Sequence, residues 1–269
     1  VGMSGNFRQM KRRILNIAVF RKETLYQKMR ALIIYLVISA VFIGCTPILS
    51  IDASTQSVYH FSDTDKNISL LDISETFGTY DGSFVLYDNN LDSWKIYDLE
   101  EATKRIPPES TYKIYDALLG LESGIITPEH SSMTWNGDAF PFPSWEADQD
   151  LNSAMQNSVN WYFQAIDSQL GINRVQEFLN KIEYGNQTTS SNLDLYWSDF
   201  SLKISPLEQV TLLKKFNTNE FHLNSQNVFS VKNAIKIAST PNGNFYGKTG
   251  TGRVNGQDIN GWFIGYVET

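Results

Sequence analysis

Two residues one helical turn apart, Ser110 and Lys113, are the first pair in this sequence whose types and spacing could do chemistry. They open an apolar run with helical spacing, and two prolines just before them keep the preceding chain out of a helix. A serine hydroxyl needs a neighbouring base to act as a nucleophile, and a lysine in a dry pocket can lose its proton and become that base. The pair alone is weak evidence, because Ser-x-x-Lys occurs by chance in most long proteins.

Two further polar motifs follow in order along the chain. A Ser-Val-Asn tripeptide stands at 158–160, between two amphipathic runs, and Lys-Thr-Gly-Thr stands at 248–251, between segments rich in aromatic residues. Ser-x-x-Lys, then Ser-x-Asn, then Lys-Thr-Gly is the signature set of active-site serine penicillin-recognising proteins and serine β-lactamases. The sequence resembles that family, which implies an α/β (α+β) fold with a central antiparallel sheet flanked by helices.

The segment from Ile106 to Thr269 resembles a more specific family. This segment is similar to the extracellular sensor domain of BlaR/MecR-type β-lactam receptors, and Tyr-Gly-Asn at 184–186 and Tyr-Trp at 196–197 look like class D β-lactamases. Four segments carry the receptor likeness: STYKIY at 110–115, NSVNWYF at 157–163, LKISPLEQV at 202–210 and GWFIGYVET at 261–269. The resemblance implies a penicillin-binding protein that is acylated by a β-lactam and triggers the induction of resistance genes.

The resemblance also assigns catalytic roles. Ser110 would attack the β-lactam carbonyl, Lys113 would be the base, and Ser158 would relay the proton to the departing ring nitrogen. The backbone N–H groups of Ser110 and Thr251 would form the oxyanion hole. In class D relatives the lysine is carboxylated by CO2, and Trp197 matches the tryptophan that steadies this carbamate. An ordinary packed aromatic is the alternative interpretation of Trp197.

The third motif would bind the substrate. Lys248 and Thr249 would hold the antibiotic carboxylate, one as a point charge and the other as a hydroxyl donor. Gly250 would let the strand backbone come close to the ligand. A lysine on an exposed strand is usually only solvated, so the assignment of Lys248 depends on the other two motifs.

Position 160 departs from the hydrolases. Class D β-lactamases usually carry Ser-x-Val, with an apolar residue beside the carbamate, whereas this sequence has Asn160. A polar amide there can hydrogen-bond the lysine nitrogen and compete with the carbamate, which would leave no base to activate the deacylating water. The sequence therefore favours a receptor that stays acylated. Two alternatives remain open: a membrane-tethered class D β-lactamase, and a small penicillin-binding transpeptidase or carboxypeptidase.

Charge is distributed unevenly along the chain. Residues 1–30 contain eight Lys or Arg and one acid, whereas the whole chain has a net charge of −7. Residues 31–51 contain no charged residue, and at about 1.5 Å per residue they would span roughly 30 Å, one hydrocarbon core. The positive-inside rule then predicts a cell-membrane protein. It would have a basic cytoplasmic segment at 1–30, a transmembrane helix at 31–51, a linker at 52–78 and an extracellular sensor domain at 79–269.

Other interpretations of the first 51 residues remain open. The apolar run could be a buried core helix or a signal peptide, and Phe42–Cys45 faintly resembles a lipoprotein cleavage site. Residues 1–30 could be an amphipathic helix on the membrane or a plain cytoplasmic loop. No nucleic-acid partner is predicted, because the basic patch is short and adjoins the span. No metal site is predicted from the three scattered histidines, and no cofactor beyond carboxylation of Lys113.

The receptor resemblance implies parts that lie beyond this sequence. In that family a zinc metalloprotease domain with His-Glu-x-x-His lies upstream on the cytoplasmic side, and no such motif occurs here. The family fold also continues after the Gly-Trp-Phe strand with another strand and a closing helix. We therefore expect 79–269 to be C-terminally truncated, with an unprotected sheet edge that makes the segment unstable when expressed alone.

Local patterns predict the elements that position the motifs. They are listed here in chain order: a hairpin at 82–97, the nucleophile helix, short helices at 150–157 and 160–170 with Ser158 at their junction, a helix around 175–179, one opened by a capping box at Ser205–Glu208, one near 228–235, and paired strands at 245–251 and 262–268. Asn255-Gly256 offers a turn between the last two strands, although a connection longer than two residues is expected.

Overall fold

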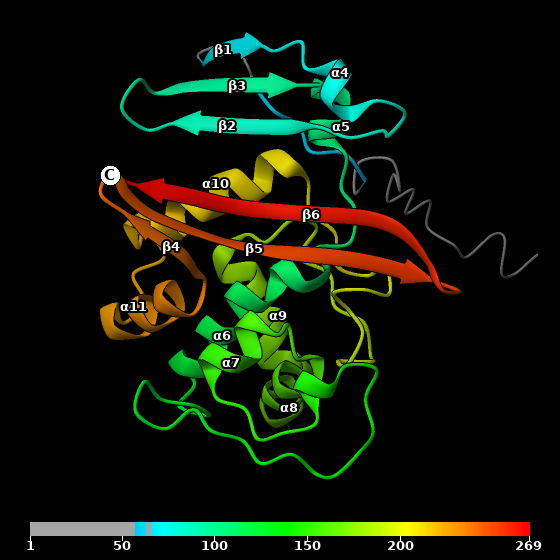
Figure 1. Cartoon of the computed structure of the whole chain (residues 1–269), viewed down its shortest axis with the longest axis vertical. Coiled ribbons are helices and arrows are strands. Elements are labelled where there is room, and N and C mark those ends of the chain that lie inside the picture. The colour runs from blue at the N-terminus through cyan, green and yellow to red at the C-terminus, as the bar shows by residue number, and fades with distance from the viewer. Residues whose placement is uncertain (1–56, 63–65) are drawn as a thin grey trace, which may run out of the picture. The chain divides into compact units, whose positions relative to one another are not determined.

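The structure is a computed structural model that describes residues 57–62 and 66–269 (Figure 1). These residues all belong to one compact unit. The predicted basic segment at 1–30 and transmembrane helix at 31–51 lie outside the described residues. Within the part of the chain that is described, no helix combines the length and the apolar character that a membrane crossing needs.

The described chain forms the following elements in order. They are β1 (Asn67–Leu70), α4 (Ser74–Phe77), β2 (Phe84–Asp88), β3 (Ser93–Tyr97), α5 (Leu99–Thr103), the 3-10 helix η1 (Glu109–Tyr112), α6 (Lys113–Glu122), the 3-10 helix η2 (Pro143–Trp145), α7 (Leu151–Gln156), α8 (Asn160–Leu170), α9 (Ile172–Ile182), α10 (Pro206–Thr218), α11 (Ser225–Ala234), β4 (Lys236–Thr240), β5 (Gly243–Val254) and β6 (Gln257–Glu268). The predicted hairpin and helices are confirmed. β1 and α4 lie within 52–78, the range predicted as a linker, and β4 was not predicted.

The strands form two three-stranded sheets, in the orders β1-β3-β2 and β4-β5-β6. β1 runs parallel to β3, and the other neighbouring strands are antiparallel. The strands expected in one central sheet are therefore divided between two sheets, with β2 and β6 as edge strands. α10 contacts both β2 and β6. Figure 1 shows the β1-β3-β2 sheet and helices α6–α9 on opposite sides of the β5–β6 hairpin.

The β5–β6 hairpin is longer than the sequence pattern indicated. Its pairing continues to Val254 and Gln257, so Asn255 and Gly256 form a two-residue connection, and the longer connection expected was wrong. Both turn residues have positive φ, 50° and 80°, as a type I′ turn requires. This turn matches the twist of the strands, so their hydrogen-bonded pairing continues up to the turn.

The core is built around α6, in which every residue from Lys113 to Leu121 is buried. Helices α7, α8 and α11 pack against α6, and Tyr112, Tyr184 and Tyr196 pack edge-to-face at its start. α10 begins with the predicted capping box, in which Glu208 N donates to Ser205 Oγ and Ser205 N donates to the Glu208 carboxylate. These contacts fix the start of α6, where the first motif lies.

Candidate active site

The first motif spans the junction of η1 and α6. Ser110 is half-buried in η1, and Lys113 is the first residue of α6 with only 1% of its surface exposed. The two elements are continuous, so both side chains lie on one face, and Lys113 Nζ donates a hydrogen bond to Ser110 Oγ at 3.0 Å. The predicted nucleophile and base are therefore in contact.

The second motif lies at the junction of α7 and α8, as the sequence predicted. Ser158 has a left-handed backbone conformation with φ 56°, and Asn160 is the first residue of α8. Lys113 Nζ donates a second hydrogen bond to Asn160 Oδ1 at 2.7 Å. The amide therefore contacts the lysine nitrogen directly.

The third motif lies on β5. Lys248 is 6% exposed and its Nζ donates to Ser158 Oγ at 2.8 Å and to Thr249 O at 3.0 Å. Thr249 and Thr251 are exposed beside it. A Cβ at Gly250 would lie 3.0 Å from Pro108 O and 3.2 Å from Ser110 N. The glycine thus lets β5 approach the turn that carries the nucleophile.

The two lysines share a dry environment that weakens their hold on protons. Burial, and then the charge of Lys248, lower the pKa of Lys113 to about 7, against the buried acids nearby that raise it. Burial lowers the pKa of Lys248 to about 8. A large share of Lys113 is therefore neutral at pH 7, which is the form that can accept a proton from Ser110.

Aromatic rings complete the surroundings of the lysine. Lys113 Nζ lies 5.6 Å from the ring centroids of both Trp197 and Phe163. Trp197 is 3% exposed and stacks on Tyr112 at a centroid distance of 6.2 Å. The structure thus places Trp197 beside Lys113, and it brings the nine residues predicted for the site together around the start of α6, the α7–α8 junction and the middle of β5.

Comparisons with known proteins agree with this geometry. Residues 78–269 match the penicillin binding protein transpeptidase domain family. The chain belongs to this family. It is 43% identical over 269 residues to the regulatory protein BlaR1 of Bacillus licheniformis, a match that covers 99% of this chain and 44% of BlaR1. The chain thus spans less than half the length of this relative.

Solved structures of related proteins are also similar to this penicillin-binding domain. The C-terminal domain of the Bacillus licheniformis BlaR penicillin-receptor matches with a TM-score of 0.74 and 46% identity, over 76% of this chain and 84% of that one. A class D β-lactamase from Sebaldella termitidis matches with a TM-score of 0.71 and 30% identity, over 76% and 82%. The domain is therefore a homologue of BlaR-type sensor domains and has the class D β-lactamase-like fold.

Four polar residues of this penicillin-binding domain were missed by the sequence analysis. Asp116 and Asp167 are fully buried, and as carboxylates neither has a hydrogen-bond donor of good geometry. Burial, and then their mutual contact, raises the pKa of Asp116 well above its ordinary value. Glu109 directly precedes Ser110, and Asn260 of β6 donates from Nδ2 to Pro107 O at 3.3 Å. Of these four residues, only Asp116 had a signal in the sequence, because it is an acidic residue inside the apolar run of α6.

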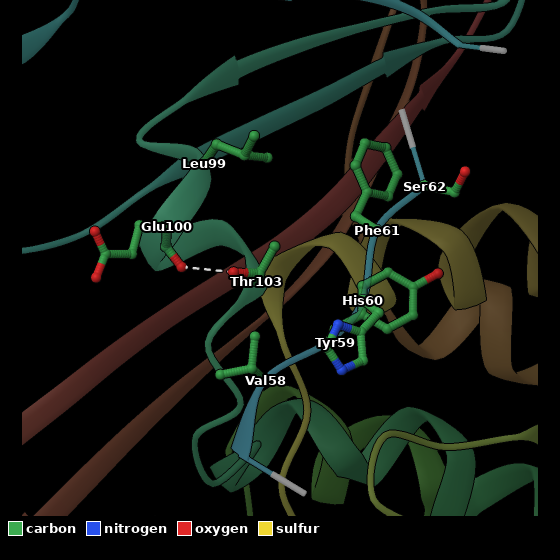
Figure 2. A pocket seen from close by; sticks show the side chains of 8 residues that line it. All are labelled: Val58, Tyr59, His60, Phe61, Ser62, Leu99, Glu100 and Thr103. Carbon is green, nitrogen blue, oxygen red and sulfur yellow. Dashed lines mark hydrogen bonds between the residues drawn. The ribbon is translucent and has the colours of Figure 1, made fainter. Parts of the chain in front are cut away.

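A separate hollow lies away from the motifs. It is lined by the segment Val58–Ser62 and by Leu99, Glu100 and Thr103 of α5 (Figure 2). Thr103 Oγ1 donates to Glu100 O at 2.8 Å. Among the residues that line this hollow, only His60 and Glu100 are of the types that commonly bind metals. Across residues 57–62 and 66–269, no three His, Cys, Asp or Glu residues gather as a metal site would require.

Proposed function

We propose that residues 79–269 are the extracellular β-lactam sensor of a membrane receptor, and that Ser110 is acylated by the antibiotic and then stays acylated. The observation that carries the proposal is the 2.7 Å hydrogen bond from Lys113 to Asn160. It is supported by the relative named regulatory protein BlaR1 and by the structural match to a penicillin-receptor domain.

Acylation follows from the contacts at the first two motifs. Neutral Lys113 takes the proton of Ser110 as Oγ attacks the lactam carbonyl, and the N–H groups of Ser110 and Thr251 receive the developing oxyanion. The ring C–N bond then breaks, and the proton reaches the leaving nitrogen through Ser158. Lys248, which donates to Ser158 Oγ at 2.8 Å, completes this relay.

Substrate binding is assigned to β5. The buried ammonium of Lys248 and the exposed hydroxyl of Thr249 would hold the carboxylate that β-lactams carry beside the ring. Gly250 keeps this strand close to Ser110, so a bound carboxylate places the lactam carbonyl over the nucleophile. This is the positioning that a reaction between two bound groups needs.

Persistence of the adduct follows from Asn160. We propose that Lys113 reacts with CO2 to give a carbamate and a released proton, and that Trp197 steadies this group. Because Asn160 binds the lysine nitrogen, this carbamate does not persist, and the amine form of Lys113 performs acylation. Deacylation would need the carbamate to activate water, so the ester remains.

The rest of the receptor is proposed from the relatives. The chain spans 44% of BlaR1, which leaves room for a zinc metalloprotease domain upstream, on the cytoplasmic side. Residues 31–51 would cross the membrane between that domain and the sensor, after the basic segment at 1–30. β-Lactams are the proposed ligands, and no nucleic-acid contact is proposed for this segment.

A burst experiment with a chromogenic cephalosporin tests the proposal. We expect one equivalent of product and then a stall, together with label retained from penicillin; Ser110→Ala should retain none. Continuous turnover in the unaltered protein would instead support a class D β-lactamase. Release of D-alanine from a D-Ala-D-Ala peptide would support a carboxypeptidase or transpeptidase.

A further inference from the structure

Glu109, the residue before the nucleophile, is held in an unusual conformation. Its φ is 51°, in the left-handed region that residues other than glycine and asparagine seldom adopt. Its N–H donates to Trp197 O at 3.1 Å, and only 6% of its surface is exposed. Such outliers persist where the surroundings over-determine them, often at functional sites. The side chain of Glu109 is therefore fixed toward β5 and β6.

The partner of Glu109 is the amide of Asn260 on β6. A Cβ placed on Gly252 would clash with Asn260 Oδ1 and would lie 2.5 Å from Glu109 Oε1, so these two oxygen atoms are neighbours beside the same backbone atom. Asn260 Oδ1 is buried and has no hydrogen-bond partner in the structure. Asn260 Nδ2 donates one of its hydrogens to Pro107 O at 3.3 Å. Turning the amide would point Nδ2 at Glu109 but would set its oxygen against Pro107 O and lose the bond to Pro107, and the orientation in the structure keeps that bond.

A direct hydrogen bond between two facing acceptor oxygens requires a proton on one of them. A neutral carboxyl and a primary amide are complementary, since the acid O–H donates to the amide oxygen and the free amide N–H donates to the acid carbonyl. A carboxylate can accept the N–H, but its charge then faces the lone pairs of Asn260 Oδ1. Burial raises the pKa of Glu109 to about 7, against smaller opposing effects of Lys113 and Asn260, which agrees with a neutral carboxyl.

We propose that Glu109 is a positioning residue for acylation: as a neutral acid it pairs with the Asn260 amide and clasps the β5–β6 hairpin to the turn that carries Ser110. The clasp acts with the 2.8 Å hydrogen bond from Trp262 Nε1 to Pro107 O. It sets the distance between the N–H groups of Ser110 and Thr251. This inference rests on the proposed function, because acylation of Ser110 is the reaction it serves.

Glu109 also acts on the base. A charged Glu109 raises the pKa of Lys113, so ionisation both opens the clasp and keeps the lysine protonated. The productive form carries a proton on Glu109 and none on Lys113, and it exists only between the two macroscopic titrations of the pair. The other titratable groups that act on Lys113 are Lys248 on β5, Asp116 on α6 and Asp167 on α8. The Arg253–Asp258 ion pair lies further along the same hairpin as Asn260.

The first experiment is the acylation rate by labelled penicillin between pH 5 and pH 10. The unaltered protein should give a bell-shaped profile, and Glu109→Gln should lose the alkaline limb, because the glutamine amide pairs with Asn260 at every pH. Glu109→Ala should lower the rate by about tenfold throughout. Glu129→Gln, an exposed acid, is the matched control and should keep the bell. An alkaline limb that persists in Glu109→Gln overturns the proposal.

A second readout needs no acylation. The pKa of Glu109 is raised on folding from 4.5 to about 7, so its stability contribution is complete below pH 4.5 and is lost as the pH rises to about 7. The melting temperature of Glu109→Gln should therefore exceed that of the unaltered protein by about 5 °C or more at pH 8, and by little at pH 4.5. In an Asn260→Ala background this gain should shrink. A pH-independent difference overturns the clasp, whereas absence of any acylation with the gain intact would instead refute the proposed function.

Discussion

The amine of Lys113 lies between Ser110 Oγ, at 3.0 Å, and Asn160 Oδ1, at 2.7 Å. A neutral amine has two N–H donors and one lone pair. When one N–H is bound by Asn160, the lone pair is free to face the hydroxyl of Ser110. In the proposed function, the amide that orients the lysine for acylation also occupies the nitrogen that a carbamate would need, so one contact would serve the forward step and hinder the next.

Asn160→Val should convert a protein that stalls into one that turns over. An apolar side chain cannot bind the lysine nitrogen, so a carbamate on Lys113 would survive acylation and activate water. We expect steady-state cephalosporin hydrolysis to rise by about tenfold or more, with a carbamate signal in 13C NMR after addition of labelled bicarbonate. Asn152→Val, at an exposed position of α7, is the control. An unchanged stall in Asn160→Val would show that the adduct persists for another reason.

Lys248→Gln should move the acid limb of the acylation profile to higher pH. The charge of Lys248 is the second cause, after burial, that lowers the pKa of Lys113 to about 7. Without that charge Lys113 holds its proton more tightly, and we expect a rise of roughly one pH unit. The rate should be measured at saturating penicillin, because binding of the antibiotic carboxylate is also weakened. Lys236→Gln, an exposed lysine on β4, should leave the limb in place.

Much of the site could be predicted because short motifs carry it. Ser110 and Lys113 are one helical turn apart, so local geometry alone puts them in contact. The start of α10 was equally clear, since Ser205 and Glu208 form a capping box whose partners are three residues apart. Contacts between the motifs, such as Lys113 with Asn160, came from the family resemblance and not from spacing.

The rest depends on packing that no local pattern encodes. All residues of β4 are exposed, so it lacks the alternation that reveals a strand. Glu109 and Asn260 meet only because the register of β5 with β6 sets Asn260 opposite Gly252. The division into two sheets is likewise not encoded locally: Phe84 of β2 and Val267 of β6 are apolar, yet 41% and 62% of their surfaces are exposed.

Asp116→Asn should stabilise the domain at alkaline pH. Burial raises the pKa of both Asp116 and Asp167, so the folded state binds protons more tightly than the unfolded state and loses stability as the pH rises above about 4. An asparagine can donate to the Asp167 carboxylate without a proton. We expect a gain of roughly 1–3 kcal/mol in unfolding free energy at pH 8, and little gain at pH 4, by urea denaturation. Asp81→Asn, at an exposed position, should show no pH-dependent gain, and an equal effect of both substitutions would exclude the buried pair as the cause.

Glu208→Ala should destabilise the domain through two losses at once. The Glu208 carboxylate accepts from Arg105 Nε at 2.9 Å and from Ser205 N at 2.9 Å, and the side chains of Arg105 and Glu208 are only 15% and 9% exposed. Removing the Glu208 carboxylate leaves the nearly buried guanidinium of Arg105 without its anion and removes the cap of α10. We therefore expect a loss of about 3 kcal/mol in unfolding free energy.

The exposed pair of Glu101 and Lys104 provides the comparison for Glu208→Ala. Their contact is 3.0 Å long, but the side chains are 30% and 56% exposed, so Glu101→Ala should cost under about 0.5 kcal/mol. Urea denaturation of both variants at one pH measures the two losses side by side. Arg105 precedes the bridge between Ile106 and Ile204 that leads into η1, so the loss at Glu208 should also slow acylation of Ser110. Equal losses in the two variants would mean that burial of the Arg105–Glu208 pair contributes nothing to the stability of the fold.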